Sequence, residues 1–287
     1  MKYLILFLII AGNARAETPI HPVYGDDNRK EVSRATRMEK ELADASAALI
    51  PDSYMIKKRT KLVLDAPTLE QSDLVCSTER YKDQPAASIC SGTLIAPDLI
   101  LTAAHCYNSP SICQKASWVF GYHESKNKKY EFKNKEVYHC KEIVFRSFDI
   151  ASGHDFAVVK LDRRVKGHRP VSLRESGTPE IQTKLILVGH PRGLPTKIAD
   201  DAWIIGIRDN ILMTNVDAYT GNSGSGVFNA DSGLLEGVLS FGKEDYEENT
   251  GRSCMSSQVY SMHDGGEAVM KIDPVRDFLK TYHSLRP

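Results

Sequence analysis

The sequence predicts a strand-rich chain, as in an all-β protein. Its apolar residues gather in segments of about four to eight residues, separated by glycine, proline and charged residues, which is the pattern of short strands between turns. Clear examples are Leu94 to Ile100, Phe156 to Leu161 and Lys184 to Gly189. One helix is expected at the C-terminus, where Asp273 and Pro274 suit an N-cap and a first helical residue.

The length and charge of the chain limit the kinds of partner that we expect. With 287 residues the chain is long enough for one large or two small domains. Its 37 basic residues balance 37 acidic residues, which gives no support for a nucleic-acid or membrane-surface partner. After the N-terminus no apolar run is long enough to span a bilayer. We therefore expect a monomer that binds neither nucleic acid nor membrane.

The N-terminus has the pattern of a secretory signal peptide. A basic start, Met1-Lys2, precedes an apolar run from Tyr3 to Ala11 and a small-residue site, Ala14-Arg15-Ala16. The alternative is a buried N-terminal strand or helix. A signal peptide of residues 1–16 predicts a secreted or periplasmic protein, where the six cysteines can form disulfides.

Residues 17–85 form a polar N-terminal segment. Within it, Arg34 to Asp44 is expected to form a short helix and Ser46 to Ile50 the first strand. Residues 51–85 show no clear pattern and hold Cys76. We interpret the segment as a pro-segment together with the first strand, or as an addition to the N-terminal barrel.

The most informative stretch is the loop from Thr220 to Gly226, with the sequence TGNSGSG. Ser223 stands between small residues, and glycine allows a sharp turn and a close approach of substrate. Such a loop also leaves backbone N–H groups free to face a developing negative charge. The alternative is a plain polar loop between two strands.

A nucleophilic serine needs a base, and a base needs a group that orients it. Among the nine histidines, His105 follows a buried apolar run and small residues in LTAAHC, which gives a rigid mount for an imidazole. Asp155 stands at the start of the apolar strand in DFAVVKL. The chain therefore carries His105, Asp155 and Ser223 in that order.

The three motifs LTAAHC, DFAVVKL and GNSGSG, in this order, resemble the trypsin/chymotrypsin superfamily of serine proteases. The resemblance runs from about Cys90 to the C-terminus. It implies a protease domain over residues 86–287, with two six-stranded antiparallel barrels, a crossing near residues 162–180 and a C-terminal helix. The form GNSGS and the stretch from His21 to Arg29 are similar to the bacterial glutamyl-endopeptidase-like (V8-like) branch.

The resemblance implies a secreted serine endopeptidase that cleaves proteins or peptides. Ser223 would attack the carbonyl, His105 would act as the base, and Asp155 would orient His105. The N–H groups of Gly221 and Ser223 would form the oxyanion hole, and no metal or organic cofactor would be needed. The alternatives are a catalytically silent binding or regulatory protein on a protease fold, and an esterase. The esterase is disfavoured because the α/β-hydrolase order of residues is absent.

Specificity is predicted less directly. Asp217 stands six residues before Ser223, an offset at which trypsin-like enzymes place the aspartate that selects arginine or lysine. An aspartate near this offset also occurs in the glutamyl branch without that selectivity. The backbone of Ser240, Phe241 and Gly242 would pair with substrate as an added strand, with Phe241 as one wall. Leu239 or Ser240 replaces the histidine with which the glutamyl branch selects glutamate.

The resemblance also implies a disulfide between Cys90 and Cys106, whose loop is worth about 3 kcal/mol in the chain-entropy model. Cys113 and Cys140 flank a predicted hairpin and could pair, which would leave Cys76 for Cys254; the pairing of these four stays open. Zinc binding is a weaker alternative, because the sequence has no C-x-x-C pair.

Asn222 departs from the trypsin pattern. Trypsin-like enzymes have an aspartate before the nucleophile, and a new N-terminal ammonium pairs with it on activation. Asparagine carries no charge, so the same ion pair cannot form. No IVGG-like start occurs before Cys90. We therefore expect the site to form without this switch.

Overall fold

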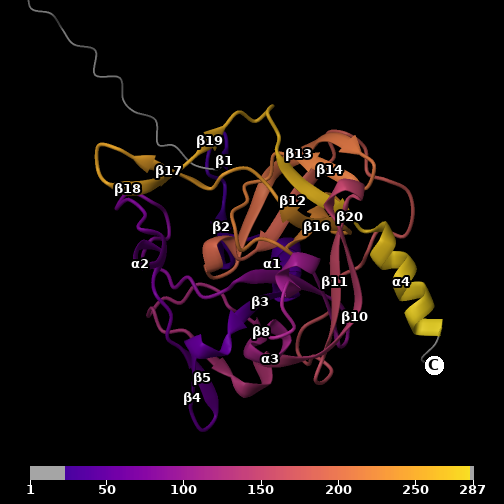
Figure 1. The fold of residues 1–287 in the computed structure, drawn as a ribbon, viewed down its shortest axis with the longest axis horizontal. Coiled ribbons are helices and arrows are strands. Elements are labelled where there is room, and N and C mark those ends of the chain that lie inside the picture. The colour runs from indigo at the N-terminus through magenta and orange to yellow at the C-terminus, as the bar shows by residue number, and fades with distance from the viewer. Residues whose placement is uncertain (1–22, 285–287) are drawn as a thin grey trace, which may run out of the picture.

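The computed structural model describes residues 23–284 and consists of two closed antiparallel barrels (Figure 1). The first barrel closes in the order β10-β11-β7-β6-β3-β8. Its strands are β3 (Ser46–Pro51), β6 (Cys90–Ala96), β7 (Leu99–Thr102), β8 (Ala116–Phe120), β10 (Val137–Asp149) and β11 (His154–Leu161). Residues 162–183, which lead to the second barrel, contain no helix or strand.

The second barrel has the order β12-β15-β16-β20-β14-β13 and is closed by pairing between β12 and β13. Its strands are β12 (Lys184–Gly189), β13 (Lys197–Arg208), β14 (Ile211–Thr214), β15 (Gly226–Asn229), β16 (Leu235–Phe241) and β20 (Glu267–Lys271). The short strand β2 (Lys30–Glu31) adds to β13. The fold class predicted from the sequence, two six-stranded antiparallel barrels with a C-terminal helix, is confirmed.

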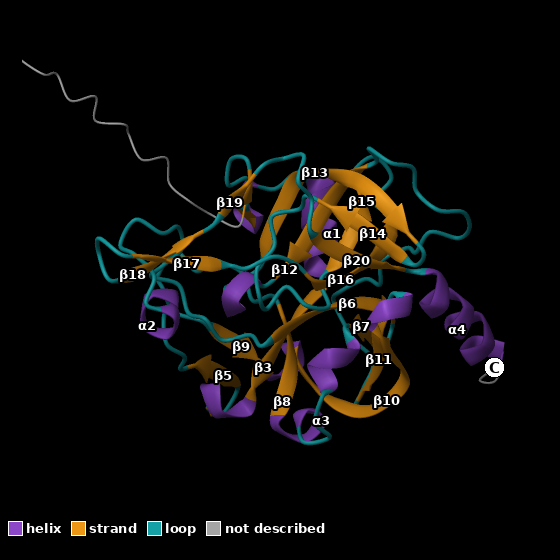
Figure 2. Cartoon of the chain, turned by 45° about the horizontal axis from the view of Figure 1, so that its top comes forward, coloured by secondary structure: helices purple, strands orange, loops and turns teal. Residues whose placement is uncertain are grey.

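Helices are few, and α2, α3 and α4 lie at the edges of the molecule (Figure 2). The α-helices are α1 (Arg37–Asp44), α2 (Leu69–Asp73), α3 (Ile112–Lys115) and α4 (Asp273–Ser284). Single 3₁₀ turns cover Val32–Arg34, Asp52–Tyr54, Ala104–Tyr107, Asn134–Glu136, Ile150–Ser152 and Pro191–Gly193. No helix of residues 23–284 is long and apolar enough to cross a membrane.

The remaining strands are short and lie outside the barrels. They are β1 (Val23–Tyr24), which pairs in parallel with β19 (Val259–Tyr260), the sheet of β4 (Met55–Lys57), β5 (Lys61–Leu64) and β9 (Glu131–Lys133), and the hairpin of β17 (Tyr246–Asn249) and β18 (Cys254–Ser257). Residues 51–85, for which we expected no regular structure, therefore contain two strands and a helix. These strands are only three or four residues long and β5 pairs with the distant β9, so local pattern did not reveal them.

Two other elements differ from the prediction. The run Leu94 to Ile100 is not one strand, because the chain turns at Pro97-Asp98 and returns as β7. Apolar residues on both sides of this turn made the run look continuous. Helix α1 begins at Arg37, not at Arg34, because Thr36 and Glu39 form a capping box that fixes the start.

The barrels are held by apolar packing and by three disulfides. Trp118 is fully buried in the first barrel, and its indole N–H donates to the Tyr107 hydroxyl at 3.0 Å. Phe278 of α4 stacks on Phe145 of β10 with ring centroids 4.8 Å apart, so the C-terminal helix also contacts the first barrel. The disulfides are Cys90–Cys106, Cys113–Cys140 and Cys76–Cys254.

Candidate active site

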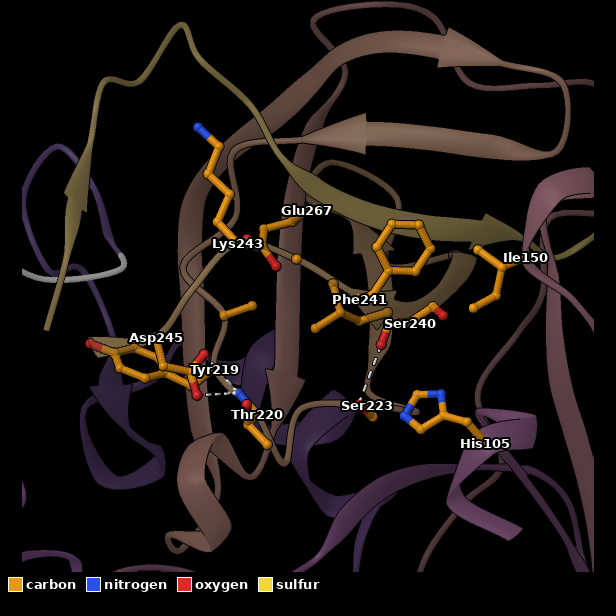
Figure 3. Close-up of a pocket in the computed structure, with 13 residues that line it drawn as sticks. His105, Ile150, Tyr219, Thr220, Ser223, Ser240, Phe241, Lys243, Asp245 and Glu267 are labelled. Carbon is orange, nitrogen blue, oxygen red and sulfur yellow. Dashed lines mark hydrogen bonds between the residues drawn. The ribbon is translucent and has the colours of Figure 1, made fainter. Parts of the chain in front are cut away.

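The structure brings His105, Asp155 and Ser223 together where the two barrels meet. Figure 3 shows His105 and Ser223 side by side in the pocket. His105 lies in the 3₁₀ turn directly after β7, and Asp155 is the second residue of β11. Because β7 and β11 are neighbours in the first barrel, the two side chains emerge side by side. Ser223 comes from the loop between β14 and β15 of the second barrel.

Asp155 is fully buried and holds the His105 ring in one orientation. Its Oδ2 lies 2.6 Å from His105 Nδ1, and its Oδ1 accepts the His105 backbone N–H at 2.9 Å. The Ser240 hydroxyl also donates to Oδ2. Burial opposes ionisation of Asp155, but the hydrogen bonds from His105 and Ser240 outweigh it and lower its pKa. The carboxylate is therefore ionised at neutral pH, and Nε2 of His105 is directed toward the pocket.

The Ser223 hydroxyl lies beside the His105 ring (Figure 3) and donates to the Ser240 carbonyl at 3.3 Å. A rotation about its Cα–Cβ bond would direct the same hydroxyl at the imidazole. Hydrogen bonds between a nucleophile and its base often form only when substrate is present. The arrangement therefore allows proton transfer from Ser223 to His105.

The loop that carries Ser223 is held at both ends. The Ser91 backbone N–H donates to the Ser223 carbonyl at 2.9 Å, and the Ser91 hydroxyl donates to the Gly221 carbonyl at 2.8 Å. Gly221 has a φ of +93°, and a Cβ there would lie 2.7 Å from the His190 carbonyl oxygen, so only glycine fits. Within residues 23–284, no hydrogen bond uses the backbone N–H of Gly221 or Ser223. Both are free to bind a substrate oxygen.

Asn222 is buried behind the loop and makes a neutral contact. Its Oδ1 accepts the Ser225 hydroxyl at 3.2 Å, and its backbone N–H donates to the Tyr219 carbonyl at 2.9 Å. The loop thus has its shape without an ion pair at this position. His190, interpreted from the sequence as a loop residue, is buried and stacks on Tyr122, away from Ser223.

A pocket of about 380 Å³ extends from Ser223 and His105 along the end of β16. It is lined by His105, Ile150, Ala218, Tyr219, Thr220, Ser223, Leu239, Ser240, Phe241, Gly242, Lys243, Asp245 and Glu267. Ser240, Phe241 and Gly242 are the residues whose backbone the sequence predicts to pair with substrate. Phe241 is 41% exposed, so its ring covers one side of the pocket and is not part of the core.

The structure does not bring Asp217 to the wall of this pocket. Asp217 is 1% exposed and faces the N-terminal segment, where its carboxylate accepts the backbone N–H groups of Tyr24 at 2.8 Å and Asn28 at 3.1 Å. Burial raises the pKa of Asp217 to about 7, although these two hydrogen bonds lower it. Asp217 therefore fixes residues 23–28 against the second barrel.

A different acid, Glu267, which the sequence motifs did not point to, lines the end of the pocket away from His105 (Figure 3). It begins β20, next to the end of β16, where Phe241 pairs with Ala268. The signal was available: a single acidic residue between Gly265-Gly266 and the apolar run from Ala268 to Met270. A charge at the start of a buried strand that follows two glycines is a candidate site residue.

Two closed antiparallel barrels that meet at a cleft define the chymotrypsin-like class of serine proteases. Residues 90–238 match the model of the trypsin-like peptidase domain, and the chain belongs to this family. Among solved structures it is similar in fold to neuropsin, a serine protease expressed in the limbic system of mouse brain. The TM-score is 0.54 at 16% identity, over 85% of this chain and 96% of neuropsin. A search of curated proteins finds no match.

Proposed function

We propose that this protein is a secreted serine endopeptidase that hydrolyses peptide bonds through an acyl-enzyme, with His105, Asp155 and Ser223 as its catalytic triad. The observation that carries the proposal is the contact of 2.6 Å between His105 Nδ1 and the buried Asp155, with Ser223 beside the same ring. A buried, ionised carboxylate fixes the tautomer in which Nε2 can accept a proton.

In the first half of the reaction, Ser223 Oγ attacks the peptide carbonyl carbon while His105 Nε2 takes the hydroxyl proton. The carbonyl oxygen becomes an oxyanion that accepts from the N–H groups of Gly221 and Ser223; losing one such donor typically costs about 3 kcal/mol. The C–N bond then breaks, and the amine leaves with the proton from His105. Ser223 is now an ester of the substrate's acyl group.

In the second half, water attacks this ester and gives a proton to His105. The bond between Ser223 Oγ and the carbonyl carbon breaks, His105 returns the proton to Oγ, and the acid product leaves. Asp155 stays ionised throughout and stabilises the charged imidazolium. Substrate backbone would add as a strand along Ser240 to Gly242, which places its carbonyl carbon near Ser223.

We place the protein in the V8-like branch, on the form GNSGS and on the neutral contact of Asn222 with Ser225. Three disulfides are compatible with an extracellular location, where they persist. The proposed signal peptide, residues 1–16, lies outside the described residues. The preference for arginine or lysine was predicted from Asp217. Because Asp217 faces the N-terminal segment, such a preference would need another acidic residue in the pocket.

The test is active-site labelling with a fluorophosphonate probe, followed by mapping of the labelled peptide. We expect labelling on Ser223, none in Ser223→Ala, and normal labelling in Ser232→Ala, a matched control in an exposed turn. Absence of labelling in folded, disulfide-bonded protein would overturn the proposal. It would favour the alternative, a catalytically silent binding or regulatory protein on this fold.

A further inference from the structure

We propose that Glu267, not Asp217, selects the substrate, and that it does so by binding a lysine or arginine side chain in the pocket next to Ser223. The inference rests on the proposed endopeptidase function and names the substrate class of the same site. It is carried by the position of the Glu267 carboxylate, by the partners of its two oxygens and by the pairing of the other charges around the pocket.

Glu267 lies across the pocket from the nucleophile. Figure 3 shows its carboxyl group between Lys243 and Phe241, at the opposite end from His105. The residue is 4% exposed, so its carboxylate is covered by the pocket walls. The pocket volume of about 380 Å³ exceeds that of any single amino-acid side chain. A side chain that enters beside Ser223 therefore meets Glu267 at its far end.

The two carboxylate oxygens of Glu267 have different surroundings. Oε1 accepts the Tyr24 hydroxyl and the Lys243 backbone N–H, each at 3.1 Å. Oε2 receives no hydrogen bond from the described residues and lies against Gly242, where a Cβ would be only 1.7 Å away. Gly242 is therefore required by the position of this carboxylate. One oxygen is fixed by the protein, and the other is available to a ligand.

The other charges of the pocket are already paired or point elsewhere. Asp245 forms an ion pair with Arg192 at 2.8 Å and accepts the Thr220 backbone N–H. The Lys243 ammonium lies 4.2 Å from the centre of the Tyr260 ring and points away from Ser223 in Figure 3. No cation of residues 23–284 lies within ion-pair distance of Glu267. The unpaired group of the pocket is thus an acid, and its complement is a cation.

The electrostatics around Glu267 agree with this assignment. Burial raises the pKa of Glu267 to about 8, although its hydrogen bonds from Lys243 and Tyr24 lower it. The titratable groups that face it are Tyr24, Asp217, Lys243, Asp245 and Tyr260. A raised pKa thus avoids an unpaired buried charge at Glu267, and a bound ammonium or guanidinium would make ionisation favourable.

The experiment compares kcat/KM for peptides that differ only in the residue before the cleaved bond, namely Lys, Arg, Gln, Leu and Glu. In the wild type we expect Lys and Arg to be cleaved fastest. Glu267→Gln, which keeps the shape of the side chain, should lower the Lys-to-Leu and Arg-to-Leu ratios about 100-fold. Glu244→Gln removes a neighbouring charge that does not line the pocket and should leave both ratios unchanged.

A second measurement uses only the wild type. Because only ionised Glu267 binds a cation well, the Lys-to-Leu ratio should rise by up to about tenfold per pH unit below pH 8 and then level off. Any effect of pH on the chemistry at Ser223 acts on both substrates and cancels in the ratio. A ratio that does not change with pH, or that is the same in Glu267→Gln, would overturn the inference.

Fluorophosphonate labelling separates this inference from the function on which it rests. If Ser223 is labelled but acidic or apolar residues are preferred, the endopeptidase stands and the assignment of Glu267 is wrong. If Ser223 is not labelled in the wild type, both fail. If Glu267→Gln slows all peptides equally while labelling is normal, Glu267 supports the pocket without selecting substrate, and the inference is again overturned.

Discussion

Asp155 and Glu267 are buried carboxyl groups at opposite ends of one pocket region, and their pKa values are displaced in opposite directions. At Asp155, three donors from His105 and Ser240 outweigh the cost of burial and lower the pKa. At Glu267, two donors do not outweigh burial and the nearby acids Asp217 and Asp245, and the pKa rises to about 8. Because both carboxyl groups are buried, the number and charge of their partners decide whether the cost of burial is outweighed.

The two ends of the pocket region therefore differ in how complete they are in the free protein. The Asp155 end is complete in the free protein, because the ring of His105 is already oriented. The Glu267 end lacks the opposite charge that would complete it. A preorganised triad together with a pocket that requires a cation would make cleavage selective without altering the chemistry at Ser223.

The largest expected effect is that of a substitution at Asp155. Asp155→Asn keeps the size of the side chain but allows the wrong tautomer of His105, and we expect kcat to fall about 10⁴-fold. The ratio between Lys and Leu peptides should not change, because Glu267 is untouched. Steady-state rate assays on both peptides would measure kcat, and a thermal melt would verify that the variant is folded. A fall of less than tenfold would mean that Asp155 does not orient the base.

A second prediction concerns the pH dependence of the free energy of unfolding, which should differ in sign between Glu267 and Asp155. The folded-state pKa of Glu267, about 8, lies above the ordinary glutamate value of 4.5. The unfolded chain therefore releases this proton first, and Glu267 destabilises the fold increasingly between about pH 4.5 and pH 8. The change in the free energy of unfolding caused by Glu267→Gln should therefore be more favourable at pH 9 than at pH 4, by on the order of a few kcal/mol.

Chemical denaturation of both proteins at the two pH values would measure that difference in the free energy of unfolding. Asp155 has the opposite sign: its pKa is lowered from 3.8, so its contribution is present at neutral pH and is lost as the solution becomes more acidic. A stability difference between Glu267→Gln and the wild type that is constant from pH 4 to pH 9 would contradict the raised pKa.

The same two ends differ in how well sequence alone predicts them. His105, Asp155 and Ser223 stand in local motifs, and the structure brings them together as the motifs indicate. Asp217 was selected by its offset from Ser223 alone, and an offset does not say which way a side chain faces. Glu267 was missed because its partner Tyr24 lies 243 residues away along the chain.

The secondary structure shows the same contrast between features with a local signal and features that depend on distant contacts. Several barrel strands, such as β3, β11 and β12, were predicted from runs of apolar residues, and the C-terminal helix from its cap at Asp273, whereas the two barrels were implied by the family resemblance. The elements that were missed, β4, β5 and α2, depend on distant contacts such as the pairing of β5 with β9. A local stretch of sequence indicates burial and turns, but no single stretch indicates which distant strand it will pair with.

The smallest effect tests whether the N-terminal segment tunes the Glu267 end. Tyr24→Phe removes one donor to Oε1, which should raise the pKa of Glu267 further and lower the Lys-to-Leu ratio about fivefold at pH 7. The matched control is Tyr260→Phe, since the Tyr260 ring lies 5.7 Å from Tyr24 but its hydroxyl donates to the Gln258 side-chain oxygen and the Glu244 backbone carbonyl, not to Glu267. A positioning role predicts that the midpoint of the ratio's pH profile moves to higher pH in Tyr24→Phe alone, with labelling of Ser223 unchanged. Equal losses for Lys and Leu peptides at every pH would show instead that Tyr24 supports the pocket only through packing.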